Sequence, residues 1–135
     1  MRALFLDPSV LLLAVGGDHP WRSGCRRVLD LVGAEQARIH LSVEGGQEFL
    51  FHRVRKVGVP QAIQEFDALD ALAVWHSFDV DVLRESRTLV ARDLARGRDA
   101  VHAATALAAG FDRIVSCDAD FDGIPGLRRL HPADV

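Results

Sequence analysis

Residues 3–9 have the sequence Ala3-Leu4-Phe5-Leu6-Asp7-Pro8-Ser9, and this stretch decides the fold. Four apolar residues in a row predict a short buried strand, which Asp7-Pro8-Ser9 stops. Proline is well tolerated at the first position of a helix, so we expect a helix from Pro8 to about Val15. An acidic side chain therefore stands at the point where a buried strand passes into a helix.

The rest of the chain repeats this alternation of short apolar strands and helices. Strands are expected at residues 38–42 and 111–116, with a short stretch around 74–75 and an edge strand at 127–130. Apolar residues at helical spacing, or an Ala-rich apolar run, predict helices over residues 21–32, 43–57, from 60 onward, 82–94 and 99–109. The pattern indicates an α/β fold in which residues 1–135 form a single domain, a central parallel sheet flanked by helices on both sides.

Composition narrows the class of protein. A chain of 135 residues, 49% of them hydrophobic, buries a core without metal or disulfide staples, and disorder is excluded. Cys25 and Cys117 make no disulfide framework, so a reducing cytoplasm suits the chain, and no apolar stretch is long enough to span a membrane. The net charge of -3 argues against a broad basic surface for nucleic acid. Candidates for local phosphate contacts are Arg53, Arg55, Arg96 and Arg98.

Four carboxylates are expected at one edge of the sheet. Asp7 and Asp118 each follow a strand, and ligands of open α/β sheets bind at the carboxyl ends of the strands. The helix that starts at Asp99 leads back to the start of the strand before Asp118, which places Asp99 at the same edge. Glu48 lies in the second turn of the helix that follows Ser42. These four acids are the candidate site.

Such a group needs a counter-charge, because two carboxylates about 5 Å apart repel by roughly 3 kcal/mol at an effective dielectric near 20. Oxygen ligands without an organised His/Cys set favour Mg²⁺, with Mn²⁺ as a substitute, and the chemistry such an ion supports is hydrolysis of phosphodiesters. Three of the four acids, taken alone, also have a simpler interpretation. Asp7 and Asp99 suit helix N-caps, and Glu48 suits a solvated helix face.

Four motifs, taken in order, resemble the PIN-domain ribonucleases and among them the VapC-type toxins of bacterial toxin–antitoxin pairs. They cover residues 4–11, 42–50, 98–104 and 114–122, each with one of the four acids. The resemblance implies a Mg²⁺-dependent endoribonuclease that cuts single-stranded or looped RNA. Asp7, Asp99 and Asp118 would hold one or two ions, and Glu48 would ligate or orient the attacking water. The outer shell would draw on Asp120, Asp122, Ser9 and Ser116.

The same resemblance implies protein partners and no membrane. A cognate antitoxin would silence the site with its C-terminal segment, and a homodimer and a toxin–antitoxin hetero-oligomer would form. The apolar helices around Trp21 and Phe66 are candidates for the groove or the dimer face, although core packing is the commoner fate of such residues.

Two features keep other interpretations open. Pro8 stands where the family has Thr or Ser, and Gly45-Gly46 either weakens the helix before Glu48 by about 1–2 kcal/mol or lets a neighbour pack closely. A catalytically weak RNA- or metal-binding module is the alternative function, and an interaction scaffold with capping acids is a third. His102 lies one turn beyond Asp99 and within reach of the site, but a structural role is the commoner one for such a histidine.

Overall fold

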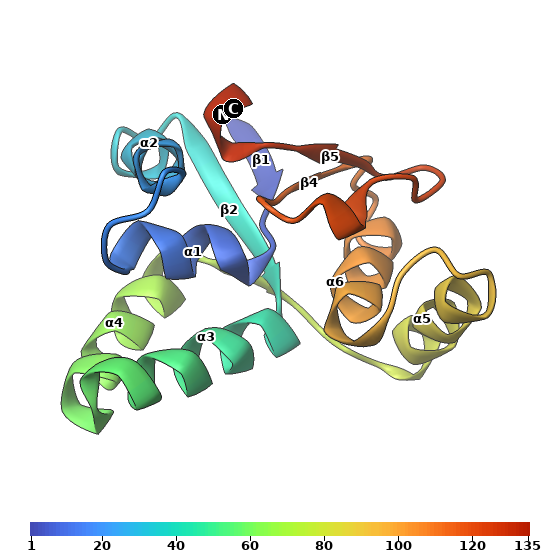
Figure 1. The fold of residues 1–135 in the computed structure, drawn as a ribbon, viewed down its shortest axis with the longest axis horizontal. Helices are drawn as coiled ribbons and strands as arrows, with labels where there is room; N and C mark the ends of the chain where they lie inside the picture. The colour runs from blue at the N-terminus through green and yellow to red at the C-terminus, as the bar shows by residue number, and fades with distance from the viewer.

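The computed structural model describes all residues from Met1 to Val135 as an α/β fold. The elements follow in the order β1 (Arg2–Phe5), α1 (Pro8–Val15), α2 (Arg22–Gly33), β2 (Ala37–Ser42), α3 (Val43–Val57), α4 (Val59–Leu72), β3 (Val74–His76), α5 (Val80–Ala91), α6 (Gly97–Ala108), β4 (Arg113–Val115) and β5 (Arg128–Leu130) (Figure 1). Short 3-10 turns, η1 (Ala119–Phe121) and η2 (Pro132–Asp134), precede and follow β5.

The sheet is parallel throughout, as the sequence predicts. β1 pairs with β2, β2 with β3, and β4 with β5. The two groups of strands meet at a parallel bridge between Leu6 and Val115, where the Asp7 N–H also donates to the Val115 carbonyl at 2.9 Å. The spatial order is therefore β3-β2-β1-β4-β5, with β1 in the middle.

Residues of β1 and the one that follows it contribute alternately to two hydrophobic cores. Leu4 and Leu6 are buried in the core that also contains apolar residues of α1 and α2. Phe5, between them, is buried in the second core, to which α5 and α6 contribute. Successive side chains of a strand point to opposite faces, so this alternation places helices on both sides of the sheet, as expected.

The helix α3 is unbroken despite Gly45 and Gly46, and the second glycine has a packing reason. A Cβ at Gly46 would lie 2.7 Å from two ring atoms of Trp75, which is too close for any real contact. The Trp75 ring stacks against Phe66 of α4, and its Nε1 donates to Asp70 at 2.7 Å. Of the two interpretations of the glycine pair, close packing is the one that the structure supports.

Some boundaries differ from the sequence prediction. α6 begins at Gly97 instead of Asp99, and its N-cap is Arg96. α5 ends at Ala91 instead of extending to residue 94, because the chain turns at Asp93, whose φ is positive at 56°. Helical periodicity gives a poor account of such ends, since caps and turns set them. None of the helices combines the length and apolar character that crossing a bilayer requires.

Candidate metal centre

The candidate site lies where the order of the strands reverses. From β1 the chain moves outward to β2 and β3, then returns through α5 and α6 to the other side of β1, where β4 lies. Crevices at the carboxyl ends of strands beside such a switch point are the usual ligand sites of open α/β sheets. Asp7 follows β1 and Asp118 follows β4, so both acids border this crevice.

Asp7 is buried, with 5% of its surface exposed. It occupies the N-cap position of α1, but its carboxylate accepts no hydrogen bond from the helix backbone. It accepts instead from the hydroxyls of Ser9 and Ser116, the latter at 2.8 Å. Burial raises the pKa of Asp7, and the two hydroxyl bonds oppose that rise. The capping interpretation therefore fails for Asp7, and both serines of the expected outer shell contact it.

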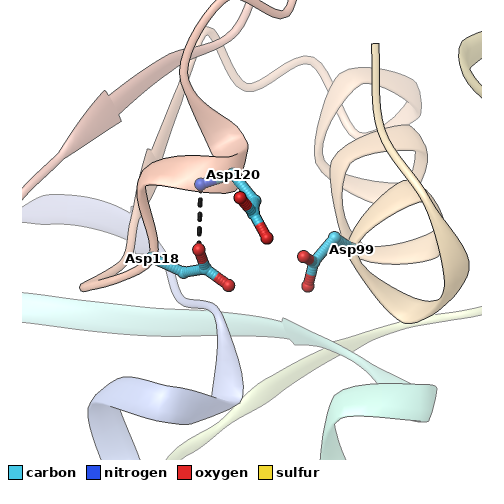
Figure 2. Close-up of side chains that lie close together, drawn as sticks. All are labelled: Asp99, Asp118 and Asp120. Carbon is cyan, nitrogen blue, oxygen red and sulfur yellow. Dashed lines mark hydrogen bonds between the residues drawn. The ribbon is translucent and has the colours of Figure 1, made fainter. Parts of the chain in front are cut away.

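Three aspartates form the most compact acidic group of the site (Figure 2). Asp99, Asp118 and Asp120 each offer a carboxylate oxygen, and these atoms lie within 4.8 Å of one another. Asp118 also accepts from the backbone N–H of Asp120 at 2.8 Å, which fixes the turn that brings Asp120 toward Asp99. Asp99 is the third residue of α6, not its cap, so its capping interpretation fails as well.

The electrostatics of this cluster suit a cation. The pKa of Asp99 is raised to about 6, first by burial and then by the charges of Asp118 and Asp7. No basic side chain lies close enough to any of the three aspartates of the cluster to form an ion pair. Oxygen donors without soft ligands fit Mg²⁺ or Mn²⁺.

Glu48 lies apart from this cluster and already has partners. Its Oε2 accepts from Nε2 of His102 at 3.0 Å, and its Oε1 lies 3.8 Å from a guanidinium nitrogen of Arg98. The hydrogen bond from His102 is the main cause of the lowered pKa of Glu48. This contact favours the ionised form of Glu48, and the charge of Glu48 is a minor cause of the raised pKa of Asp7.

Other residues named from the sequence have different surroundings. Asp122 receives two hydrogen bonds from Arg129, at 2.9 and 3.2 Å, which hold it outside the three-aspartate group. Arg53 is buried and its guanidinium makes two hydrogen bonds to Glu65 of α4, so it is not available for phosphate. Arg55 lies over the ring of Phe51, 5.6 Å from its centre.

Arg96 and Arg98 remain suited to phosphate contact, because both are mostly exposed at the start of α6 beside Asp99. An open cavity of about 400 Å³ is lined in part by Arg96, Asp99 and Asp120.

Comparison with known proteins decides the family. A model of the PIN domain matches residues 4–127. The chain belongs to the PIN-domain family. Ribonuclease VapC13 of Mycobacterium tuberculosis and a VapC ribonuclease of Mycobacterium bovis are each 29% identical over 132 residues, covering 94% of this chain and 98% of the relative. The resemblance to VapC-type PIN ribonucleases is therefore confirmed.

Solved PIN structures share the fold. VapBC2 from Rickettsia felis, bound to a DNA fragment from its promoter, gives a TM-score of 0.74 at 20% identity, over 96% of this chain and 98% of that one. VapC20 of Mycobacterium tuberculosis, a Sarcin-Ricin loop cleaving toxin, gives 0.72 at 17% identity, over 93% and 98%.

Two contacts at the candidate site go beyond the sequence interpretation. Asp120 was expected only in an outer shell, but it lies with Asp99 and Asp118. Its spacing of two residues from Asp118 was a signal for this, because a carboxylate at a turn often accepts from the N–H two residues on. His102 contacts Glu48, and its position one turn after Asp99 was the corresponding signal.

Proposed function

We propose that this PIN-domain protein is the ribonuclease toxin of a toxin–antitoxin pair, a metal-dependent endoribonuclease that acts on single-stranded or looped RNA in the cytoplasm. The observation that carries the proposal is the group of Asp99, Asp118 and Asp120, with Asp7 beside it, at the switch point of the sheet. The nucleases of this family depend on a metal, and its VapC relatives are named ribonucleases.

The donor set assigns a role to each acid. Asp99, Asp118 and Asp120 would hold the ion, and Asp7 would contribute directly or through water, with Ser9 and Ser116 fixing its carboxylate. When bound there, Mg²⁺ or Mn²⁺ lowers the pKa of a coordinated water and offsets charge at the phosphate. The raised pKa of Asp99 supports this assignment, since it reflects burial and the negative charges of Asp118 and Asp7, which a bound cation would offset.

The remaining residues would handle water and substrate. Glu48, kept ionised by His102, is suited to orient the water that attacks the scissile phosphate. Arg96 and Arg98 at the start of α6 would contact neighbouring phosphates of the RNA, each as a charge-assisted hydrogen-bond donor.

Protein partners are part of the proposal. Solved structures of similar fold include toxin–antitoxin complexes, such as one from Klebsiella pneumoniae with a TM-score of 0.73 at 16% identity. Large apolar side chains are exposed at the N-cap of α2 and on α3, α4 and α5, as an interface requires: Trp21, Phe51, Ile63, Leu72, Leu83 and Val90. We expect a cognate antitoxin and a homodimer to cover part of this surface. A cationic side chain of the antitoxin would suit the acidic cluster in place of metal.

The test is cleavage of total bacterial RNA by the partner-free protein in Mg²⁺, in Mn²⁺ and in EDTA. We expect discrete fragments that require metal and disappear in Asp7→Asn and Asp99→Asn. Asp81→Asn is the matched control, because Asp81 lies on α5 with 92% of its side chain exposed. RNA binding without cleavage in the wild-type protein would favour the weak binding module instead. If the protein neither cleaves RNA nor binds Mn²⁺, only the interpretation as an interaction scaffold would remain.

A further inference from the structure

His102 connects two helices that the chain brings together from distant positions. It lies on α6 with 1% of its surface exposed. Its Nδ1 is 2.8 Å from the hydroxyl of Ser42, and its Nε2 is 3.0 Å from Oε2 of Glu48. Both partners belong to the start of α3, Ser42 as its N-cap and Glu48 in its second turn. Each ring nitrogen of His102 therefore has one partner on the same neighbouring helix.

The hydrogen atoms in this chain of contacts fit one arrangement. The backbone N–H of Gly45 donates to Oγ of Ser42 at 2.9 Å, so the Ser42 hydroxyl is free to donate its own proton onward. Donation to Nδ1 of His102 leaves the ring proton on Nε2, which donates to the Glu48 carboxylate. A proton on Nδ1 instead would direct the bare Nε2 at a carboxylate oxygen and leave the Ser42 hydroxyl without an acceptor. Of the two neutral tautomers, only the Nε2–H form uses every donor.

The backbone of α3 is shaped to allow this approach. A Cβ at Gly45 would lie 3.3 Å from Oγ of Ser42 and 3.7 Å from Cε1 of His102. The first of these distances is tighter than most real contacts, so a side chain at this position would press on the hydroxyl that contacts the ring. Gly45 therefore leaves room for the contact between Ser42 and His102, whereas Gly46 leaves room for the ring of Trp75.

Little else restrains Glu48. Its other contact is Arg98 at 3.8 Å, and the side chain of Arg98 is 62% exposed. Surface pairs of this kind contribute little, because the two long side chains lose entropy when they are held together. The direction of the Glu48 carboxylate thus depends on one hydrogen bond from a buried ring.

We propose that His102 is a positioning residue for the nuclease reaction, which directs the Glu48 carboxylate toward the aspartates while Ser42 fixes the tautomer of the ring. This inference rests on the proposed function, because it gives Glu48 the task of orienting the attacking water. Partners that orient a functional carboxylate without touching the substrate are typically worth 10- to 100-fold in activity. The loss should appear in kcat, with KM for RNA nearly unchanged.

Two substitutions separate the two hydrogen bonds of the ring. The amide nitrogen of Gln reaches about as far as Nε2, so His102→Gln keeps a donor for Glu48. The side chain of Asn is shorter and reaches about as far as Nδ1. His102→Asn therefore keeps a partner for Ser42 but loses the hydrogen bond to Glu48. Both variants are neutral and polar. If His102 only filled space in the core, the shorter Asn side chain would lower the stability of the protein, and kcat of the folded variant would not change.

The experiment follows cleavage, at saturating Mg²⁺, of a single purified RNA that the wild type cuts in total bacterial RNA, with thermal unfolding measured on each variant. We expect His102→Asn to lower kcat 10- to 100-fold, with KM changed less than about threefold, and His102→Gln to restore most of the rate. Equal rates in the two variants, or a loss confined to KM, would overturn the proposal.

A second readout needs neither metal nor activity. A long-range ¹H–¹⁵N correlation spectrum of the metal-free wild-type protein at pH 7.5 reports which nitrogen of His102 carries the proton. We expect protonated Nε2 and bare Nδ1. Protonation at Nδ1 would refute the arrangement even if every variant folds poorly. Cleavage by the wild type and its loss in Asp99→Asn test the proposed function separately, so a failure there is not confused with a failure of the role of His102.

Discussion

The acidic cluster should cost the metal-free protein stability, and Asp99→Asn is the substitution that reveals it. The pKa of Asp99 rises from an ordinary 3.8 to about 6 in the folded protein. A pKa that is higher in the folded state means that the folded state binds the proton more tightly, so stability falls as pH rises from about 4 to above 6. The difference corresponds to about 3 kcal/mol at neutral pH.

Two effects reduce the gain expected from removing this charge. Asp99 is only partly buried, so solvent screens part of the repulsion. It is also the third residue of α6, where a negative charge favours the helix by about 0.3–1 kcal/mol. We therefore expect Asp99→Asn to be more stable than the wild type by about 1–2 kcal/mol at pH 7.5 in EDTA, although it is inactive.

The assay is urea unfolding in EDTA at pH 4.5 and pH 7.5, then in Mg²⁺ at pH 7.5. The advantage of Asp99→Asn should shrink at the lower pH, where Asp99 of the folded wild type is already protonated. Mg²⁺ should stabilise the wild type and not the variant. Asp122→Asn is the control, because the pKa of Asp122 is shifted in the opposite direction. Arg129 lowers that pKa, so removing the charge of Asp122 should not stabilise the protein. A less stable Asp99→Asn at pH 7.5, or an advantage independent of pH, would refute the argument.

Three further predictions concern packing and the surroundings of the site. Gly46→Ala should destabilise by up to about 2 kcal/mol, since overpacking against Trp75 costs about 1–3 kcal/mol and improved helix propensity returns about 1; a Trp75→Leu background should relieve the loss in thermal unfolding. Arg53→Gln should lower stability by about 1–3 kcal/mol by breaking its buried ion pair but leave RNA cleavage intact, in contrast to a phosphate-binding arginine. Ser116→Ala should raise the pKa of Asp7 further and move the acidic limb of the cleavage profile to higher pH, as a rate measurement from pH 5 to 8 would detect.

Local patterns in the sequence were sufficient for most elements. The apolar run after Ala3 and the stop at Asp7-Pro8 predict β1 and α1, and the periodicity from Val43 predicts all of α3. These signals need only the spacing of neighbouring residues along one strand or helix. The convergence of acids also followed from local information, because parallel strands have a common carboxyl edge.

What the sequence could not supply depends on contacts between distant segments. Arg53 appeared available for phosphate because its partner, Glu65, lies on the next helix and meets it only after the α3–α4 hairpin forms. His102 and Ser42 are 60 residues apart, and no spacing rule connects them. The N-cap interpretation of Asp99 failed because α6 begins two residues earlier, at Gly97, in a stretch of Arg and Gly that carries no clear start signal.

The placement of β1 between two cores has a consequence for changes in chain length. Deleting one residue within Leu4–Leu6 would exchange the faces of the remaining side chains and move Asp7 by about 3.3 Å along the strand. One lost codon would therefore disrupt both cores and the acidic site together. In contrast, the exposed turn between α1 and α2 adjoins neither β1 nor the acidic cluster and should accept extra residues. The number of residues in the chain is thus fixed most strictly at Leu4–Leu6, where core residues directly precede a carboxylate of the site.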